Sequence, residues 1–105
     1  MLNEIQGNLQ TRDIQYWRDK RKHEVDFIYL KRGKAPIAIE CTLSSNDFDA
    51  RNLLSFRHLY PDGENYVASP DIERGFKREY RNIVVSFVNL SELVNILQAG
   101  KKKDQ

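Results

Sequence analysis

Apolar residues in this chain fall into short blocks whose spacing predicts alternating helices and strands. Leu2, Ile5 and Leu9 recur at helical spacing, so residues 1–10 are predicted to form a helix. Three further runs are rich in β-branched and aromatic residues and are separated by turn-forming segments, which is typical of strands. These runs cover residues 14–18, 24–30 and 35–42. They predict a three-stranded meander after the first helix.

The second half of the chain continues this alternation. A helix is predicted from about Asn46 to Tyr60, where Pro-Asp-Gly at 61–63 stops it. Its expected buried residues are Phe48, Leu53, Phe56, Leu59 and Tyr60. A short strand is predicted at residues 65–69, and the polar stretch 70–81 is predicted to be a loop or irregular helix. Residues 83–88 are nearly all apolar and are predicted to form a strand buried on both faces. Ser91 and Glu92 are expected to open a last helix that ends at Gly100.

This order of elements predicts one α/β domain over residues 1–100, with a central mixed sheet flanked by helices. A chain of 105 residues is long enough for a single core. The connection from strand 35–42 through the helix to strand 65–69 should be right-handed and parallel. The basic residues 101–105 are expected to form a disordered tail. A helical pattern that begins at residue 1 without a capping residue predicts either a fragment of a longer chain or a compact stand-alone relic of one.

The first long strand carries carboxylates where a hydrophobic residue is usual. With a period of two, Glu24 and Asp26 are predicted on one face of the strand, and Val25, Phe27 and Tyr29 on the other. Acids are also common on the solvated face of a half-exposed strand pair. That interpretation stays open, and it fits Glu24 best because this residue lies at the entry of the strand.

The next strand repeats the arrangement, since Glu40 shares a predicted face with Ala38 and Thr42. A tight turn would place Asp26 opposite Ile39 and would point Glu40 to the wrong face. The two acids share a face only if the register is shifted by one residue. That shifted register pairs Lys31 with Ala35, and we predict it. Two carboxylates on neighbouring strands suit a hard divalent cation such as Mg²⁺.

Several short motifs occur in an order that resembles the PD-(D/E)-x-K nuclease superfamily. The motifs are Glu4, Tyr16-Trp17-Arg18, Glu24-Val25-Asp26-Phe27 and Ile39-Glu40-Cys41-Thr42. More narrowly, the sequence is similar to the nuclease-like domain at the C-terminus of certain bacterial and archaeal AAA-type ATPases. The resemblance extends from the first helix to the last.

The resemblance implies a restriction-endonuclease-like αβββαβ core with a metal-dependent site. Asp26, Glu40 and the backbone carbonyl of Cys41 would hold Mg²⁺ or Mn²⁺, and Glu4 would be a third acid carried by a helix. Thr42 occupies the position of the superfamily's catalytic lysine. The implied catalytic set is therefore Glu4, Asp26, Glu40 and Thr42, in which the uncharged Thr42 stands in place of the lysine.

Loss of one preorganised cationic group commonly costs on the order of 10²–10³ in rate. The sequence therefore favours a degenerate nuclease-like domain that binds nucleic acid or has a regulatory role. One alternative is an active Mg²⁺-dependent DNA or RNA endonuclease in which Arg51 supplies the missing cation. Another is a structural or protein-interaction module of an ATPase, whose ATPase domain would precede residue 1.

Basic residues are clustered, although the formal net charge is only +2. Arg18, Lys20, Arg21 and Lys22 lie around the turn before the second strand, and with Arg51 they are the predicted nucleic-acid contacts. Charge at a hairpin tip also favours solubility. The alternative that these basic residues serve solubility, and do not contact nucleic acid, stays open. His23, in the same turn, is expected to be solvent-exposed.

The single cysteine excludes an internal disulfide. Cys41 lies in an apolar row of its predicted strand and is expected to be a core residue in a reducing compartment. No apolar run approaches the thickness of a bilayer, and no signal peptide is evident. We therefore expect a cytoplasmic protein without a membrane partner.

Overall fold

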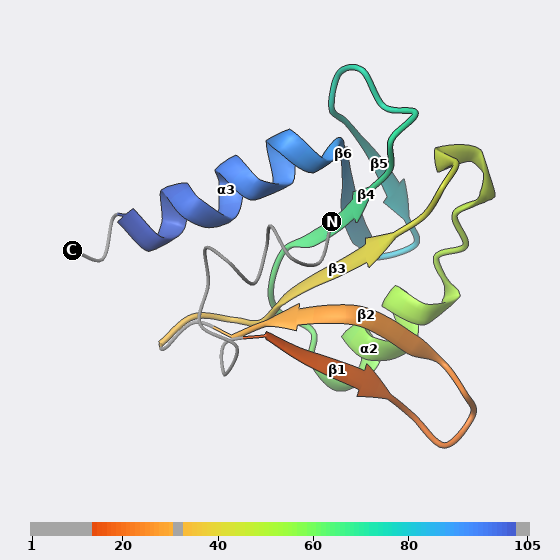
Figure 1. The fold of residues 1–105 in the computed structure, drawn as a ribbon. Coiled ribbons are helices and arrows are strands. Elements are labelled where there is room, and N and C mark those ends of the chain that lie inside the picture. Colours follow the sequence, from red (N-terminus) through yellow and green to blue (C-terminus); the bar gives the residue numbers. More distant parts are fainter. Residues whose placement is uncertain (1–13, 31–32, 103–105) are drawn as a thin grey trace.

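The computed structural model describes residues 14–30 and 33–102. Within them, six strands form one mixed sheet flanked by two helices, which confirms the predicted α/β class (Figure 1). The strand order is β1-β2-β3-β4-β6-β5. The predicted first helix, including Glu4, lies outside the described residues.

The order of the helices and strands agrees with the predicted meander and crossover. The strands are β1 (Ile14–Arg18), β2 (Glu24–Tyr29), β3 (Ile37–Cys41), β4 (Asn65–Ala68), β5 (Phe76–Tyr80) and β6 (Ile83–Val88). The helices are the 3-10 turn η2 (Ser45–Asp47), α2 (Arg51–Leu59) and α3 (Leu90–Lys102). β1, β2 and β3 pair antiparallel, whereas β3, β4 and β6 pair parallel, as predicted for the crossover through α2. β5 pairs antiparallel with β6 at the end of the sheet.

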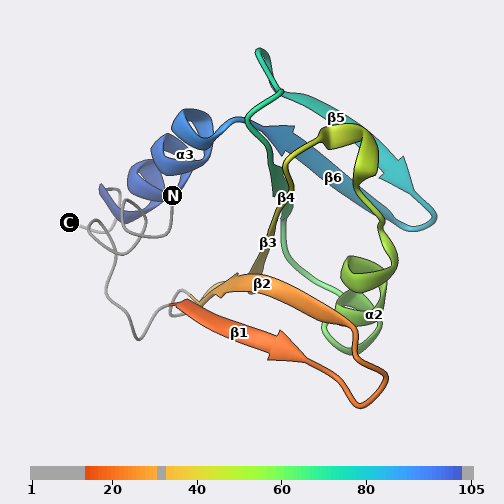
Figure 2. The ribbon, with the colours of Figure 1, turned by 45° about the vertical axis from the view of Figure 1, so that its right-hand side comes forward.

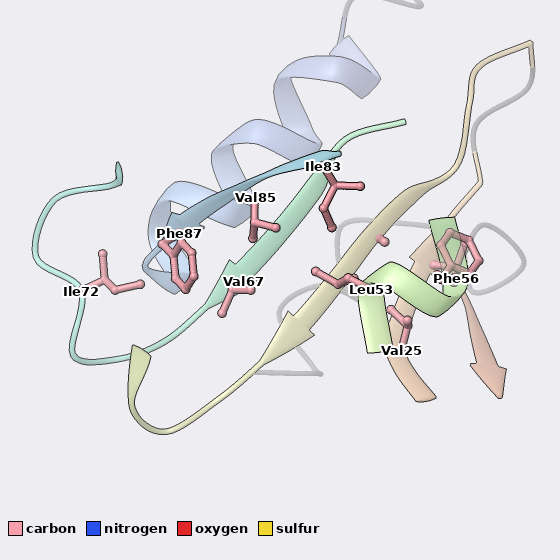
Figure 3. Packing of buried hydrophobic residues seen from close by; sticks show 10 residues of the cluster. Val25, Leu53, Phe56, Val67, Ile72, Ile83, Val85 and Phe87 are labelled. Atoms are coloured by element: carbon pink, nitrogen blue, oxygen red, sulfur yellow. The ribbon is translucent and has the colours of Figure 1, made fainter. Parts of the chain in front are cut away.

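The sheet is covered on both faces, with α2 on one side and α3 on the other (Figure 2). Ten buried residues form the core on the α2 face (Figure 3). They are Val25, Ile28, Ala38, Leu53, Phe56, Val67, Ile72, Ile83, Val85 and Phe87. A second cluster lies on the α3 face and consists of Tyr29, Ile39, Tyr66, Ala68, Val88, Leu93 and Leu97. Burying apolar surface on both faces is the main favourable contribution to the stability of this layered fold.

The prediction that Val25 shares a face with Phe27 and Tyr29 is wrong. Val25 packs in the α2-side core with Ile28, whereas Phe27 and Tyr29 pack on the α3 side. The reason is a shift in register between β1 and β2, where two residues of β2, Asp26 and Phe27, oppose one residue of β1, Tyr16. Such a bulge interrupts the alternation of faces at Asp26 and Phe27.

The predicted helix 46–60 is confirmed only over Arg51–Leu59. Its first turn is replaced by η2 and an extended Phe48, whose ring packs edge-on against Tyr80 and Phe87. Burial of that ring keeps residues 48–50 out of the helix. The predicted burial of Leu59 and Tyr60 is wrong, because both are about half exposed at the end of α2.

Three other predictions in the second half need correction. The stretch 70–81, which is predicted to be a loop or irregular helix, contains strand β5. Its side chains are almost all exposed, and so it lacks the apolar signal of a core strand. In β6, Val84 is exposed, and the strand is therefore not buried along both faces. α3 continues to Lys102, past the expected end at Gly100.

Arg57 cross-links the starts of β3 and β4. It is 4% exposed, and its guanidinium donates hydrogen bonds to four backbone carbonyls and one side chain. The carbonyls belong to Pro36, Tyr60, Asp62 and Glu64, and the side chain is that of Asn65. A buried cation of this kind is tolerated only when its donors are satisfied.

Gly63 completes this cross-link. Its φ of 127° lies in a region that favours glycine, and an added Cβ would approach the Pro36 carbonyl oxygen to 2.1 Å. The loop can therefore close over the guanidinium of Arg57 only without a side chain at position 63.

We expect Arg57→Met to lower the free energy of unfolding by about 3–5 kcal/mol, because it leaves several buried carbonyls without donors. Urea denaturation followed by circular dichroism measures this loss. His58→Ala, at the neighbouring exposed position, is the matched control and should change stability by no more than about 0.5 kcal/mol. A loss below about 1 kcal/mol for Arg57→Met would contradict the role given to this residue.

Candidate functional site

The register of β2 against β3 is the shifted one that we predicted. Phe27 lies opposite Ile39, and Ile28 lies opposite Ala38. Continued by one residue, this register sets Asp26 opposite Glu40. The pairing places the two candidate metal ligands at the end of the β2–β3 ladder, beside the C-terminal end of β3.

The Asp26 carboxylate is held against the backbone of β3. Its Oδ2 accepts a hydrogen bond of 2.9 Å from the Cys41 amide. The side chain is otherwise exposed to solvent. Asp26 therefore presents an anchored carboxylate that a solvent cation can reach.

Glu40 lies deeper in the fold, with 9% of its surface exposed. Its Oε1 accepts a hydrogen bond of 3.4 Å from the Asn52 side-chain amide. The Asn52 side-chain oxygen in turn accepts a bond of 3.3 Å from the Glu24 amide. Asn52 thus ties the start of β2 to the end of β3 from the first turn of α2, and it orients the Glu40 carboxyl group.

Sequence reasoning missed Asn52. A usable signal was present, because Asn52 precedes Phe56 by four residues and so lies on the same face of the helix. A polar residue on the buried face of a helix usually has a hydrogen-bond partner.

The negative charges around Glu40 are not compensated within the described residues. Burial, followed by the charges of Asp26 and Asp49, raises the pKa of Glu40 to about 7 despite the opposing hydrogen bond from Asn52. Burial and the same Asp26 and Glu40 charges raise the pKa of the Cys41 thiol to about 11. A divalent cation bound here would relieve this repulsion.

The donor set fits Mg²⁺ or Mn²⁺ held largely by water. Mg²⁺ takes oxygen ligands and often uses only one or two carboxylates. Asp26 and Glu40 supply these, and the Cys41 backbone adjoins the Asp26 carboxylate. In the part of the chain that the structure describes, no three histidine, cysteine or acidic side chains gather into a metal-binding group. The implied third acid, Glu4, lies outside that part.

Thr42 occupies the position of the catalytic lysine, and Arg51 is the predicted substitute cation. Neither side chain is directed at these acids. The Thr42 hydroxyl donates to the Ser44 carbonyl at 3.0 Å. The Arg51 guanidinium is bound by Asp49, with Nη2–Oδ2 and Nε–Oδ2 distances of 2.7 and 2.8 Å, and the side chain is 81% exposed. Across residues 14–30 and 33–102, neither Asp26 nor Glu40 forms an ion pair.

The predicted nucleic-acid contacts are only partly available. Arg18 forms an ion pair with Glu24 at 3.6 Å. Lys20, Arg21 and Lys22 are exposed in the turn between β1 and β2. They form a basic tip next to the start of β2, as the sequence predicted.

Asp19 fixes the shape of this turn. Its Oδ1 accepts hydrogen bonds from the Arg21 and His23 amides, each at 2.9 Å. The His23 ring lies 3.0 Å from Asp19 Oδ2 and is half-buried, so the prediction of a solvent-exposed His23 is wrong. The contact with Asp19 draws the imidazole back onto the turn.

The raised pKa of Glu40 makes stability depend on pH. The pKa of Glu40 is about 7 in the folded chain, whereas the ordinary pKa of a glutamate carboxyl group is 4.5, so the folded chain keeps this proton up to about pH 7. Stability from this group is therefore greatest at low pH and is lost as the pH rises through that window. We expect wild type to lose about 1–3 kcal/mol relative to Glu40→Gln between these two pH values. Urea denaturation at a series of pH values tests this, and a constant difference between the two proteins would contradict it.

None of the described helices combines the length and apolar character needed to cross a membrane.

Comparison with known proteins places the chain in a family. Comparisons with curated proteins and with solved structures give no match. Residues 1–92 match the family described as Domain of unknown function (DUF4143). The chain belongs to this DUF4143 family.

Proposed function

We propose that this chain is a degenerate PD-(D/E)-x-K nuclease-like domain that binds nucleic acid and cuts it poorly or not at all. The observation that carries the proposal is a pair of carboxylates at the end of the β2–β3 ladder, each held by its own hydrogen bond, with no cation directed at them in the described part of the chain. The acids support binding of Mg²⁺ or Mn²⁺. The absence of a positioned lysine or arginine there argues against efficient catalysis.

The metal-binding half of the proposal depends on how the two acids are held. The Cys41 amide fixes Asp26, and Asn52 fixes Glu40, so both carboxylates are oriented before a cation arrives. A bound Mg²⁺ would polarise a phosphate oxygen and lower the pKa of a coordinated water. Oriented ligands reduce the entropy cost of binding, and the repulsion between the acids favours a divalent ion.

The limit on catalysis depends on position 42. In the superfamily that this sequence resembles, a lysine at this position would orient the attacking water and stabilise the transition state. Thr42 carries no charge, and its hydroxyl proton is already donated to Ser44. Arg51 is held by Asp49 on the exposed side of the helix start. Among residues 14–30 and 33–102, the site therefore lacks the electrostatic group that is worth on the order of 10²–10³ in rate.

Thr42→Lys tests the proposal by restoring the missing charge. We expect wild type to bind labelled DNA and to cleave it barely above background in Mg²⁺ or Mn²⁺. We expect Thr42→Lys to raise metal-dependent cleavage by at least about 10-fold, since the charge returns next to oriented acids. Cleavage is followed on denaturing gels, and circular dichroism verifies that each variant is folded.

The double variant Asp26→Asn/Thr42→Lys is the matched control, because it keeps the new charge and removes one ligand. It should lose the gained activity. Rapid cleavage by wild type would instead support the active nuclease with a relocated cation. Absence of any nucleic-acid binding would overturn the proposal and favour a structural module.

A further inference from the structure

We infer that the edge strand β5 and its flanking cations form the surface that holds single-stranded nucleic acid. This inference rests on the proposed function and names the site at which binding occurs. The β5 surface consists of Phe76 and Arg78, which share one face of β5, together with Lys77 on the opposite face and the flanking residues Arg74 and Arg81. None of these residues belongs to the basic tip that the sequence predicted.

The candidate metal site cannot provide affinity for phosphates by itself. Asp26 and Glu40 bring two carboxyl groups close together, and the nearby Arg51 is neutralised by Asp49. Affinity for nucleic acid comes mainly from cations that neutralise phosphates. A nucleic-acid-binding domain built on this fold therefore needs free cations elsewhere on its surface.

The β5 surface offers such cations. All four of its basic side chains are exposed, and none forms an ion pair with a residue that the structure describes. Between Arg74 and Arg81 the only acidic residue is Glu79. The predicted contacts Arg18 and Arg51 are, by contrast, already paired with acids.

The same surface carries an aromatic stack. The rings of Phe76 and Phe87 are nearly parallel, with an interplanar angle of 7° and centroids 4.9 Å apart. The Arg78 guanidinium lies 5.0 Å from the Phe76 centroid and 5.6 Å from that of Phe87. Phe76 remains 37% exposed. Aromatic rings and planar guanidinium groups are the surfaces on which unpaired bases stack.

Protection of the sheet edge explains only part of this arrangement. Charged residues on an edge strand prevent association with other strands, and β5 lies at such an edge (Figure 2). That role needs only charges that project into solvent. Arg78 lies over two rings instead, which combines charge with a stacking surface.

The sheet also relates this surface to the acid pair. Phe76 pairs with Phe87, Phe87 with Val67, and Val67 with Glu40, so all four lie in one row across the sheet. Three strand spacings separate Phe76 from Glu40, which is roughly 14 Å. The β5 surface and the acids are therefore close enough for one bound single strand to contact both.

Fluorescence anisotropy with a labelled oligo-dT of about 15 nucleotides tests the inference. We expect Arg78→Ala to weaken binding at least about 10-fold and to reduce the slope of log K against log salt by about 0.7. Arg78→Lys keeps the charge but loses the planar group, so it should keep the slope and still lose affinity. Lys34→Ala removes an exposed cation outside the β5 surface and should leave affinity unchanged.

The outcomes separate this inference from the proposed function. In one outcome, the triple variant Lys20→Ala/Arg21→Ala/Lys22→Ala loses binding while Arg78→Ala binds like wild type. The assignment of the binding site to the β5 surface is then wrong, and the proposed function stands. If duplex DNA competes as well as single strands, the single-strand assignment is overturned. If wild type binds no nucleic acid, both proposals fall. Thermal unfolding shows that each variant is folded.

Discussion

The register between β2 and β3 is the constraint on which the candidate site depends. Side chains alternate between the faces of a strand, so a shift of one residue would have turned Glu40 away from Asp26. The observed pairing of Phe27 with Ile39 sets the acids across from one another, and the Cys41 amide then binds the Asp26 carboxylate. Burial of the Glu40 carboxyl group, and then its proximity to Asp26, raises its pKa, and this is the cost of the arrangement.

The stabilising cross-link and the candidate site lie at opposite ends of β3. Arg57 ties together the starts of β3 and β4 by bonds to Pro36 and Glu64, whereas the acids lie at the other end of β3. The buried carboxyl group of Glu40 opposes folding at neutral pH, and the Arg57 cross-link and the two apolar clusters offset this cost. Natural proteins commonly retain such unfavourable groups at functional sites.

The sequence predicted the meander, the parallel crossover and the register, because these follow from apolar periodicity and from the demand that two acids share a face. It could not show the bulge that moves Val25 to the α2 face, since the bulge depends on pairing with β1. Asn52 and Arg57 looked like ordinary polar positions on a helix, and their roles arise from contacts with segments far along the chain. β5 was missed because an exposed edge strand has little apolar signal. The β5 surface could therefore be recognised only from the fold.

Paramagnetic broadening of amide signals by Mn²⁺ tests the central claim most directly. In a ¹⁵N-labelled protein, substoichiometric Mn²⁺ should broaden the amides of Asp26, Glu40 and Cys41 first, well before that of Lys77 on β5. Excess Mg²⁺ should reverse the effect, and Asp26→Asn should weaken it. Uniform broadening, or selective broadening centred on other acids such as Asp71, would contradict a cation site between β2 and β3.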